Sequence, residues 1–320
     1  MKNIVFIIAA LLTALAGYGQ RLVVAQDGSG TYSTLQAAFD AIPVHHEKPV
    51  EIYVKKGIYK EVLTLPAGKD HVILTGEDKD QTIITYDNHT GKVSPKGDTI
   101  NTYTSATFFI QVSDFTASNL TFQNNAGFTA GQAVAVFAFG DKLAFNNCRF
   151  LGFQDVLFCS GPNSRQYYRN CYIEGTTDFI FGPATAVFQN CIIHSKKNSH
   201  ITAASTPQDH AYGFVFIDCK LTADADLNGV SLGRPWRPYS SVTYIRCNMG
   251  SHIIPQGWNN WKNAANEHTA RYAEHKSTGP GAQASARASW SIQLNDDEAK
   301  AYNLRNILAG NDKWMPLATK

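Results

Sequence analysis

The segment Asn170-Cys171-Tyr172-Ile173 recurs with small changes along the middle of this 320-residue chain. In each copy a polar residue precedes a cysteine, and a large apolar residue lies two places after that cysteine. The other copies are Asn147-Cys148-Arg149-Phe150, Asn190-Cys191-Ile192-Ile193, Asp218-Cys219-Lys220-Leu221 and Arg246-Cys247-Asn248-Met249, while Asn119-Leu120-Thr121-Phe122 has leucine in place of cysteine. This alternation is typical of a strand that turns one face inward.

The spacing of these copies indicates a repeat fold. The key positions 120, 148, 171, 191, 219 and 247 are separated by 28, 23, 20, 28 and 28 residues. A period in the twenties, made of short strands and turns, predicts a solenoid because each coil can bury its inward face only against its neighbours. We therefore predict an all-β fold, a single-stranded β-solenoid.

The repeat also bears on the state of the cysteines. A cysteine is a small apolar residue that suits an inward ladder, so free core thiols are the default expectation. The alternative is a disulfide bridge between Cys171 and Cys191 on adjacent rungs, which an exported protein would permit.

The N-terminal end of the repeat has a helical pattern. Residues 34–42 carry an apolar face, with Ser33 or Thr34 as cap and Pro43 just beyond. The residues on that face are Leu35, Ala38, Phe39 and Ile42. A solenoid needs its open end covered, so we expect this helix to cap it.

The C-terminal end is polar and irregular. We expect the rungs to stop after about Trp261 and residues 263–320 to pack along the outside of the solenoid, with a helical stretch near residues 297–308. No linker marks a second domain, so residues 21–320 are predicted to form a single domain.

Residues 1–20 have the pattern of a signal peptide. Lys2 precedes an apolar run from Ile4 to Ala16 that is too short to span a bilayer with ordinary flanks. We expect a secreted, periplasmic or cell-surface protein that has no membrane contact after cleavage. The alternative is a short membrane anchor.

The composition argues against several classes of protein. With 28 Lys and Arg against 26 Asp and Glu, the net charge is +2, so no nucleic-acid partner is expected. Aromatic residues make up 12% and charged residues 17%, which weakly favours a neutral or polymeric ligand. The sequence has no zinc-type histidine spacing, phosphate loop, dinucleotide fingerprint or G-x-S-x-G element. We expect a monomer.

Two aspartates occupy the same place in successive repeats. Asp155 lies seven residues after Cys148, and Asp178 lies seven residues after Cys171. Adjacent rungs are about 4.8 Å apart, and two carboxylates at such a distance do not both ionise cheaply. The pair would divide into an acid and a base or nucleophile. The alternative is that each is a turn aspartate that caps its own backbone.

Three further polar residues belong with this pair. Arg234 lies thirteen residues before Cys247, as Asp178 does before Cys191, which predicts that they share one face two rungs apart. The guanidinium would hold an ionised carboxylate. Gln132 and Gln154 would donate to a developing oxyanion. The alternatives are a surface ion pair for Arg234 and an ordinary strand-start residue for Gln132.

Several short motifs together resemble the pectin methylesterases (pectinesterases), a family of right-handed parallel β-helix enzymes. The motifs are Asp27-Gly28-Ser29-Gly30, Gly57-Ile58-Tyr59-Lys60-Glu61, Gln132-Ala133-Val134-Ala135-Val136, Gln154-Asp155-Val156-Leu157, Asp178-Phe179-Ile180-Phe181-Gly182 and Leu232-Gly233-Arg234-Pro235-Trp236. The resemblance extends over about residues 21–320. It implies hydrolysis of galacturonate methyl esters in pectin, with release of methanol and pectate, as in cell wall modification and pectin degradation.

The resemblance also implies a role for each motif residue. Asp178 would be the nucleophile and Asp155 the general acid and then base. Gln132 and Gln154 would stabilise the oxyanion, and Arg234 would orient Asp178 and keep it ionised. No metal or organic cofactor is expected.

The resemblance places aromatic residues in a sugar cleft, namely Trp236, Phe181 and Phe158. Phe158 stands where the family often has tyrosine, so any hydroxyl contact to substrate there would be lost. Val156 stands where threonine is usual, and we expect this change to affect packing near Asp155 only.

Two alternatives remain open from the sequence. One is another pectin-active β-helix enzyme, a polygalacturonase or a lyase, because a retaining glycosidase also holds its carboxyl groups about 5 Å apart. The other is a carbohydrate-binding solenoid without catalysis, which would need no pair of aspartates in register.

Overall fold

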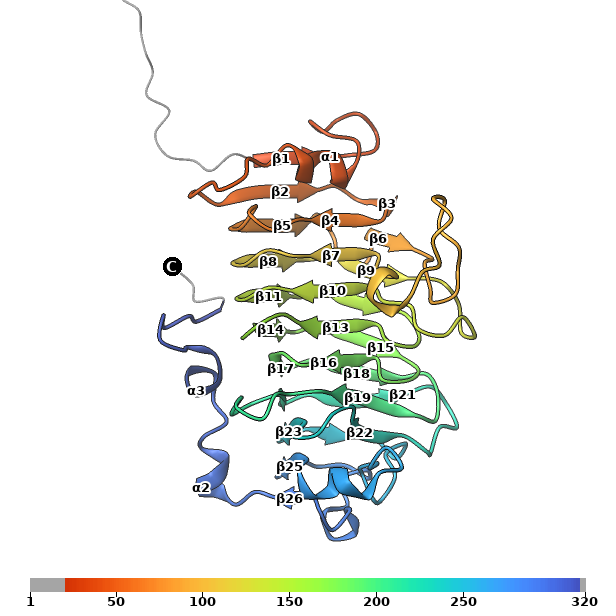
Figure 1. Ribbon diagram of the computed structural model, residues 1–320, viewed down its shortest axis with the longest axis vertical. Coiled ribbons are helices and arrows are strands. Elements are labelled where there is room, and N and C mark those ends of the chain that lie inside the picture. The colour runs from red at the N-terminus through yellow and green to blue at the C-terminus, as the bar shows by residue number, and fades with distance from the viewer. Residues whose placement is uncertain (1–20, 317–320) are drawn as a thin grey trace, which may run out of the picture.

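The computed structural model describes residues 21–316. In this part of the chain, three parallel sheets run along a stack of coils, and each coil visits the three sheets in turn (Figure 1). The fold is a parallel β-helix, as the repeat predicts. The proposed signal peptide, residues 1–20, lies outside the described residues.

The A sheet has eleven strands in the described chain, and each coil begins with one of them. Its strands are β1 (Arg21–Val24), β2 (Val50–Val54), β5 (Val72–Gly76), β8 (Phe115–Ser118), β11 (Leu143–Asn146), β14 (Arg165–Arg169), β17 (Thr185–Gln189), β20 (Phe214–Ile217), β23 (Ser241–Ile245), β25 (Arg271–His275) and β26 (Ile292–Gln293).

The B and C sheets follow in each coil, with eight and seven strands in the described chain. The B sheet contains β3 (Gly57–Lys60), β6 (Thr82–Tyr86), β9 (Thr121–Asn124), β12 (Arg149–Leu151), β15 (Tyr172–Gly175), β18 (Ile192–Ser195), β21 (Lys220–Ala223) and β24 (Asn248–Met249). The C sheet contains β4 (Leu63–Leu65), β7 (Phe108–Ile110), β10 (Val136–Phe139), β13 (Leu157–Ser160), β16 (Ile180–Gly182), β19 (His200–Ala204) and β22 (Ser231–Pro235).

The recurring segment forms the corner between the A and B sheets. The residue before each key position has a left-handed backbone, with φ of 52° at Asn147 and 54° at both Asn170 and Asn190. Asparagine adopts this conformation at little cost, which explains its use at the corner. The cysteine that follows points inward and is buried.

All six cysteines are buried free thiols. Cys171 and Cys191, the two for which a bridge was the alternative, each place Sγ near backbone carbonyl oxygens of the A sheet, Phe145 O at 3.6 Å and Tyr168 O at 3.4 Å. The structure therefore agrees with the default expectation of free core thiols.

Stacked aromatic rings fill the interior beneath the A sheet. Five buried rings form a column with successive centroid distances of 4.9, 4.7, 4.6 and 4.4 Å. The column consists of Phe145, Tyr168, Phe188, Phe216 and Tyr244. Such stacking stabilises the coils beyond the burial of apolar area, and it accounts for part of the high aromatic content.

The N-terminal cap is the helix α1 (Leu35–Asp40). Thr34 Oγ1 accepts a hydrogen bond from the Ala37 N–H at the start of this helix. Leu35 and Phe39 are buried, and the Phe39 ring stacks on Phe108 of β7 at 5.4 Å. The prediction of a capping helix is confirmed.

The prediction that the rungs stop after about Trp261 is wrong. β25 pairs with β23 and β26 pairs with β25, so the A sheet continues to Gln293. The reason is packing: Tyr272 of β25 is fully buried, and its ring lies 4.6 Å from Trp258. Arg287 and Glu274 form a buried ion pair at 2.7 Å in the same end of the solenoid.

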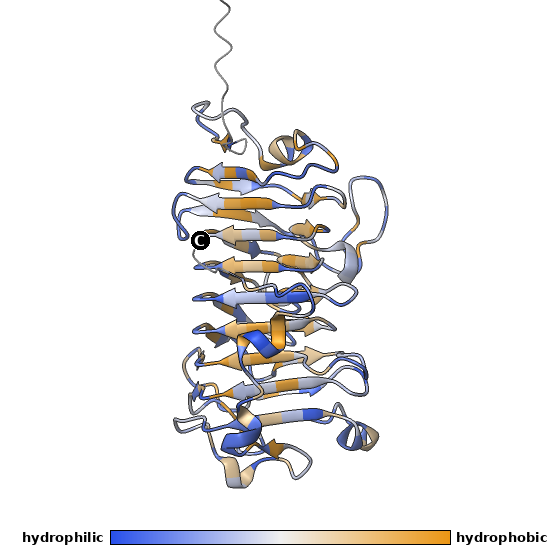
Figure 2. Cartoon of the chain, turned by 90° about the vertical axis from the view of Figure 1, so that its left-hand side faces the viewer, coloured by the Kyte–Doolittle hydropathy of each residue, from blue (hydrophilic) through white to orange (hydrophobic). Residues whose placement is uncertain are grey.

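Only the last part of the chain lies on the outside. The helices α2 (Asp296–Ala299) and α3 (Leu304–Leu308) run beside the A sheet (Figures 1 and 2). Ile307 and Leu308 pack against outward apolar residues of that sheet, including Val187 and Val215. Three short 3₁₀ helices complete the described elements: η1 (Thr102–Thr104), η2 (Ala264–His268) and η3 (Ala284–Ala286).

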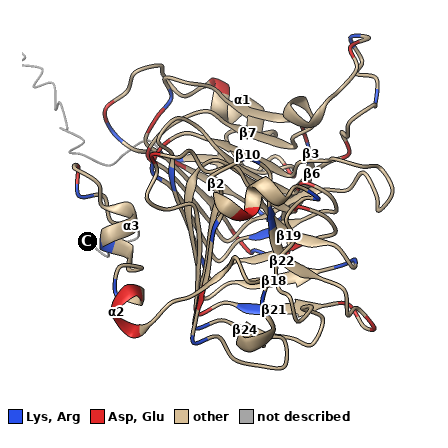
Figure 3. Ribbon diagram, turned by 60° about the horizontal axis from the view of Figure 1, so that its bottom comes forward, with Lys and Arg blue, Asp and Glu red and all other residues tan. Residues whose placement is uncertain are grey.

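Charged residues are spread over the turns and edges of the solenoid rather than gathered on one face (Figure 3). This distribution fits the near-balance of acidic and basic residues in the sequence. Within residues 21–316, none of the helices has the length and hydrophobicity that a membrane span requires.

Candidate active site

A pocket of about 270 Å³ lies at the C sheet. The connections that lead from the B sheet into the C sheet supply much of its polar lining, because side chains there point outward over the sheet. The lining residues are Thr102, Tyr103, Gln132, Gln154, Asp155, Asp178, Phe181, Ala203, Arg234, Trp236 and Trp261. All five of the predicted catalytic residues are therefore in one pocket.

The two aspartates occupy equivalent positions on adjacent coils. Leu157 pairs with Ile180, which sets Asp155 beside Asp178. Both have left-handed backbones, with φ of 63° at Asp155 and 50° at Asp178. Because of this local turn, each aspartate lies at the pocket while the residue after it is buried in the core. The residue after Asp178, for example, is Phe179. The register predicted from the cysteine repeat is confirmed for this pair.

Arg234 holds Asp178 through two contacts. Nε lies 3.0 Å from Oδ1 and Nη2 lies 2.6 Å from Oδ2 of the carboxylate. Such a paired geometry is stronger and more directional than a single contact. Asp178 is only 5% exposed, so the guanidinium supplies charge compensation that water does not.

The predicted register of Arg234 is wrong by three residues, although the contact itself was expected. Arg234 pairs with Ala203, which pairs with Phe181 rather than with Asp178. The connection from the C sheet to the A sheet is two residues long after β16 (183–184) and five after β22 (236–240). Counting back thirteen residues from Cys247 therefore stops three residues short of the position equivalent to Asp178, and the long arginine side chain spans the difference.

Burial and charge separate the ionisation of the two aspartates. Burial first, and then the negative charge of Asp178, raise the pKa of Asp155 well above its ordinary value. Burial also raises the pKa of Asp178, and its hydrogen bonds and charge contact with Arg234 offset part of that rise. The guanidinium is bonded to Asp178 alone, so Asp178 is the member of the pair that ionises first.

Gln132 and Gln154 lie on adjacent coils and are joined by an isolated parallel bridge. Both side chains line the pocket beside the aspartates. Their amide N–H groups are the neutral donors available to an oxygen that gains negative charge there.

His200 lies on the coil after Asp178, and its carbonyl oxygen accepts the Asp178 N–H at 2.8 Å. Burial, with the nearby charge of Arg234, lowers the pKa of this histidine to about 4. Its Nδ1 is 2.7 Å from Ser231 Oγ. His200 is therefore neutral above that pH and positions the Asp178 backbone.

The aromatic residues are arranged in two layers. Phe181 and Trp236 line the pocket, with ring centroids 6.1 Å apart. Phe158, predicted as a third cleft residue, does not line the pocket. It stacks on Phe181 at 4.4 Å and so supports that ring from the adjacent coil.

Four lining residues were missed by the sequence reasoning: Thr102, Tyr103, Ala203 and Trp261. Trp261 packs over Arg234, with the guanidinium carbon 3.6 Å from the ring centroid. Tyr103 lies on η1, in a long connection outside the repeat, and reaches Phe158 at 5.7 Å. The only signal for Trp261 was a tryptophan in a polar segment beyond the cysteine repeat.

Within residues 21–316, no group of three or more His, Cys, Asp or Glu side chains is placed to hold a metal ion. The pocket residues themselves offer two carboxylates, one of them already bonded to Arg234.

A parallel β-helix with paired carboxylates, an arginine, two amides and aromatic rings at one sheet defines a hydrolase that acts on a polysaccharide. The chain belongs to the pectinesterase family, whose model matches residues 21–311. It is a carboxylic ester hydrolase that removes methyl esters from pectin. Family membership decides against the polygalacturonase, lyase and non-catalytic alternatives.

Individual relatives agree with this assignment. The chain is 38% identical over 281 residues to pectinesterase 31 of Arabidopsis thaliana, covering 86% of this chain and 88% of that protein. The structure of pectin methylesterase from carrot matches with a TM-score of 0.83 and 33% identity, over 93% of this chain and 95% of the other. A pectin methylesterase in complex with a hexasaccharide matches with a TM-score of 0.82 and 26% identity, over 95% and 100% of the two chains. These likenesses establish a right-handed parallel β-helix.

Proposed function

We propose that Asp178 is the nucleophile of this pectin demethylesterification and that Asp155 is the general acid and base. The observation that carries this assignment is the double contact of Arg234 with Asp178. The neighbouring buried carboxyl, Asp155, has no such contact with a cation. The arginine favours the ionised form of Asp178, while burial and the neighbouring charge favour the protonated form of Asp155.

In the first half of the reaction, a carboxylate oxygen of Asp178 attacks the carbonyl carbon of the galacturonate methyl ester. The carbonyl oxygen becomes an oxyanion, to which the amides of Gln132 and Gln154 donate. The bond to the methoxy group breaks as Asp155 gives its proton to that oxygen. Methanol leaves, and an anhydride joins Asp178 to the sugar.

In the second half, the ionised Asp155 takes a proton from water. The resulting hydroxide oxygen attacks the sugar acyl carbon, and the bond to Asp178 breaks. The products are a galacturonate carboxyl group and the ionised nucleophile. Arg234 again balances the charge of Asp178.

We infer that Trp236 and Phe181 contact the sugar rings of the substrate, with Phe158 behind Phe181. Their place in the lining of the pocket and the tight stack of Phe158 on Phe181 support this division. The relative crystallised with a hexasaccharide supports an oligosaccharide in the same cleft.

We also propose that residues 1–20 are a signal peptide and that residues 21–320 act as one exported domain, as a monomer. The near-neutral charge and the apolar run of residues 4–16 support this proposal. Mass spectrometry of the protein recovered outside producing cells tests it. A mature N-terminus near residue 21 is expected, and a retained N-terminus would contradict it.

Two measurements test the mechanism. On highly methylated pectin, methanol should appear without loss of chain length, and chain cleavage would overturn the reaction assigned. Rapid acid quenching of the unmodified chain during turnover should leave a galacturonyl adduct on the peptide that contains Asp178, because the anhydride at Asp178 is an obligatory intermediate of the proposed steps. An adduct on another residue would overturn the nucleophile assignment.

A further inference from the structure

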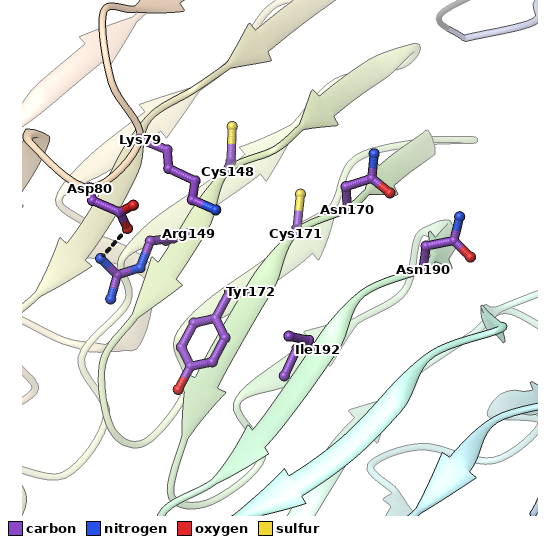
Figure 4. A pocket seen from close by; sticks show the side chains of 9 residues that line it. All are labelled: Lys79, Asp80, Cys148, Arg149, Asn170, Cys171, Tyr172, Asn190 and Ile192. Carbon is purple, nitrogen blue, oxygen red and sulfur yellow. Dashed lines mark hydrogen bonds and ion pairs between the residues drawn. The ribbon is translucent and has the colours of Figure 1, made fainter.

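A second pocket lies on the outside of the solenoid where the A and B sheets meet, on a different sheet from the candidate active site. Its volume is about 340 Å³. Lys79 and Asp80 of the β5–β6 connection form one wall, and the starts of β12, β15 and β18 form its floor (Figure 4). Nothing in the proposed mechanism uses this pocket.

The floor is a row of outward side chains from successive coils. Arg149 pairs with Tyr172, Tyr172 with Ile192, and Ile192 with Lys220. These steps repeat at the coil spacing of about 4.8 Å, which is close to the length of one unit in a 1,4-linked pyranose chain. A sugar chain that lies along the row would therefore have one outward side chain beneath each of its units.

Tyr172 and Ile192 give this row an apolar centre. Ile192 is 40% exposed, so its side chain offers apolar surface to the pocket. The Tyr172 ring is fixed, with the Arg149 guanidinium carbon 5.8 Å from its centroid and the His194 ring at 5.9 Å. A fixed apolar surface bordered by hydrogen-bonding groups suits a sugar.

The charge around the pocket is positive. Lys79 and Arg149 line it, against one lining carboxylate, Asp80, which lies 2.9 Å from Arg149. Glu174, on the same face, is held by Lys196 at 3.0 Å and accepts the Tyr172 hydroxyl at 2.9 Å. No acidic residue in the described chain forms an ion pair with Lys79. The pocket thus favours an anion.

Two side-chain amides stand on the far side of the pocket from Lys79 (Figure 4). Asn170 and Asn190 occupy the same corner position on successive coils, and their side chains make no hydrogen bond with other described residues. By contrast, Asn147, one coil earlier, donates to Asn119 at 2.7 Å. The Asn170 and Asn190 amides are therefore available to hydroxyl groups of a ligand.

We propose that this pocket binds a de-esterified, anionic stretch of galacturonan, the product of the enzyme's own reaction. The inference rests on the pectin-demethylating activity, because every turnover converts a neutral ester into a carboxylate that Lys79 and Arg149 can bind. Carboxylates on a chain laid over Tyr172 and Ile192 would meet these cations, and its hydroxyls would meet Asn170 and Asn190. A second site on the same polymer keeps the enzyme attached between turnovers through a high effective concentration.

The test is affinity electrophoresis of the full chain in gels that contain fully de-esterified polygalacturonate. The double variant Lys79→Ala/Arg149→Ala removes both cations of the pocket. The matched control Lys48→Ala/Lys56→Ala removes two exposed lysines from the N-terminal end of the solenoid, so the net charge falls equally. Thermal melting of each variant checks that the fold is retained.

The pocket variant should bind the polygalacturonate roughly ten-fold more weakly than the unmodified chain, as expected for the loss of charged hydrogen bonds. The control variant should bind as the unmodified chain does. Equal binding by all three proteins, or an equal loss in both variants, would overturn the proposal. Methanol release by the unmodified chain is measured in parallel, and its absence would contradict the activity without bearing on the pocket.

Discussion

At the scale of single residues, the site depends on two neighbouring carboxyl groups that have different hydrogen-bond partners. Asp155 and Asp178 have the same backbone conformation, the same register and nearly the same burial. The difference is Arg234, which bonds to Asp178 alone. One guanidinium therefore divides two similar residues into a nucleophile and an acid.

The first prediction concerns the acidic limb of the pH profile. Asp178 must be ionised to attack, so activity falls as pH drops through its pKa. In Arg234→Lys the two-point contact is lost, and a single ammonium does not replace it. The pKa of Asp178 should rise, and the acidic limb of kcat/KM should move to higher pH with at least a ten-fold loss at the optimum. If the acidic limb of kcat/KM stays at the same pH in this variant, Arg234 does not set the pKa of Asp178.

The second prediction concerns the opposing effects of Asp155 on catalysis and stability. Asp155→Asn should lower kcat by roughly 10²–10⁴-fold because the proton donor is lost.

The folded pKa of Asp155 lies above its unfolded value, so the stabilising effect of this carboxyl group is present below pH 3.8 and disappears as pH rises through the folded pKa. The variant should therefore melt roughly 2 °C higher than the unmodified chain at pH 8. At pH 3.5 this difference should vanish, and a lower melting temperature at pH 8 would contradict the account.

Sequence reasoning found the pair of aspartates because two features coincide: equal spacing from a buried cysteine and a chain that stacks in register. It located Arg234 by a count that is wrong by three residues, since the connections between the C and A sheets differ in length. It missed Tyr103 and Trp261 because both lie outside the repeat, where no period fixes their position. Phe158 was placed in the cleft, whereas it packs behind Phe181.

At the scale of elements, one arginine makes several of the contacts that attach the C-terminal segment to the solenoid. Arg165 of β14 contacts Asp141 at 2.5 Å and Asp312 at 2.6 Å, and it also donates to the Leu308 carbonyl oxygen at 3.1 Å. Its guanidinium carbon lies 5.6 Å from the Trp314 ring. α3 is short, so these contacts and its apolar face hold it in place rather than its own hydrogen bonds.

The third prediction follows from this attachment. Arg165→Ala should destabilise the fold by about 1–3 kcal/mol, because two carboxylates and a carbonyl each lose one of their donors. Limited proteolysis should cut the variant between residues 294 and 316 much faster than the unmodified chain. Arg305→Ala, on α3 itself and without these contacts, is the control. Equal cleavage of both variants would show that Arg165 does not anchor the segment.

The sequence predicted α1 correctly because capping residue, apolar face and following proline agree. It placed the end of the rungs too early, since β25 has no cysteine and its segment is polar on average. Tyr272 and the buried pair of Glu274 with Arg287 make those residues part of the core. A hydrophobicity pattern does not reveal that a charged residue is buried with its partner.

At the scale of the whole molecule, the solenoid separates stability from function. The interior is a continuous core of aliphatic side chains, aromatic rings and free thiols, while most of the reactive groups lie on the turns that enter the C sheet. Stacked coils bring residues 132, 154, 155, 178 and 234 together although they are far apart in the sequence. The same regular spacing produces the second pocket beside the B sheet.

The fourth prediction concerns metals. The proposed steps use only carboxyl, amide and guanidinium groups, so EDTA should leave methanol release unchanged. Activity that falls with EDTA and returns with calcium would contradict this mechanism. Dialysed protein without chelator is the control for loss of activity on handling.

The most direct test of the account is methanol release by Asp178→Ala on highly methylated pectin. Asp226→Ala is the matched control, since Asp226 also has a left-handed backbone, with φ of 67°, and lies in another connection between the B and C sheets. Asp178→Ala should lose methanol release by at least about 10⁴-fold while keeping the fold, and the control should retain it. Full activity in Asp178→Ala would contradict the assignment of the nucleophile.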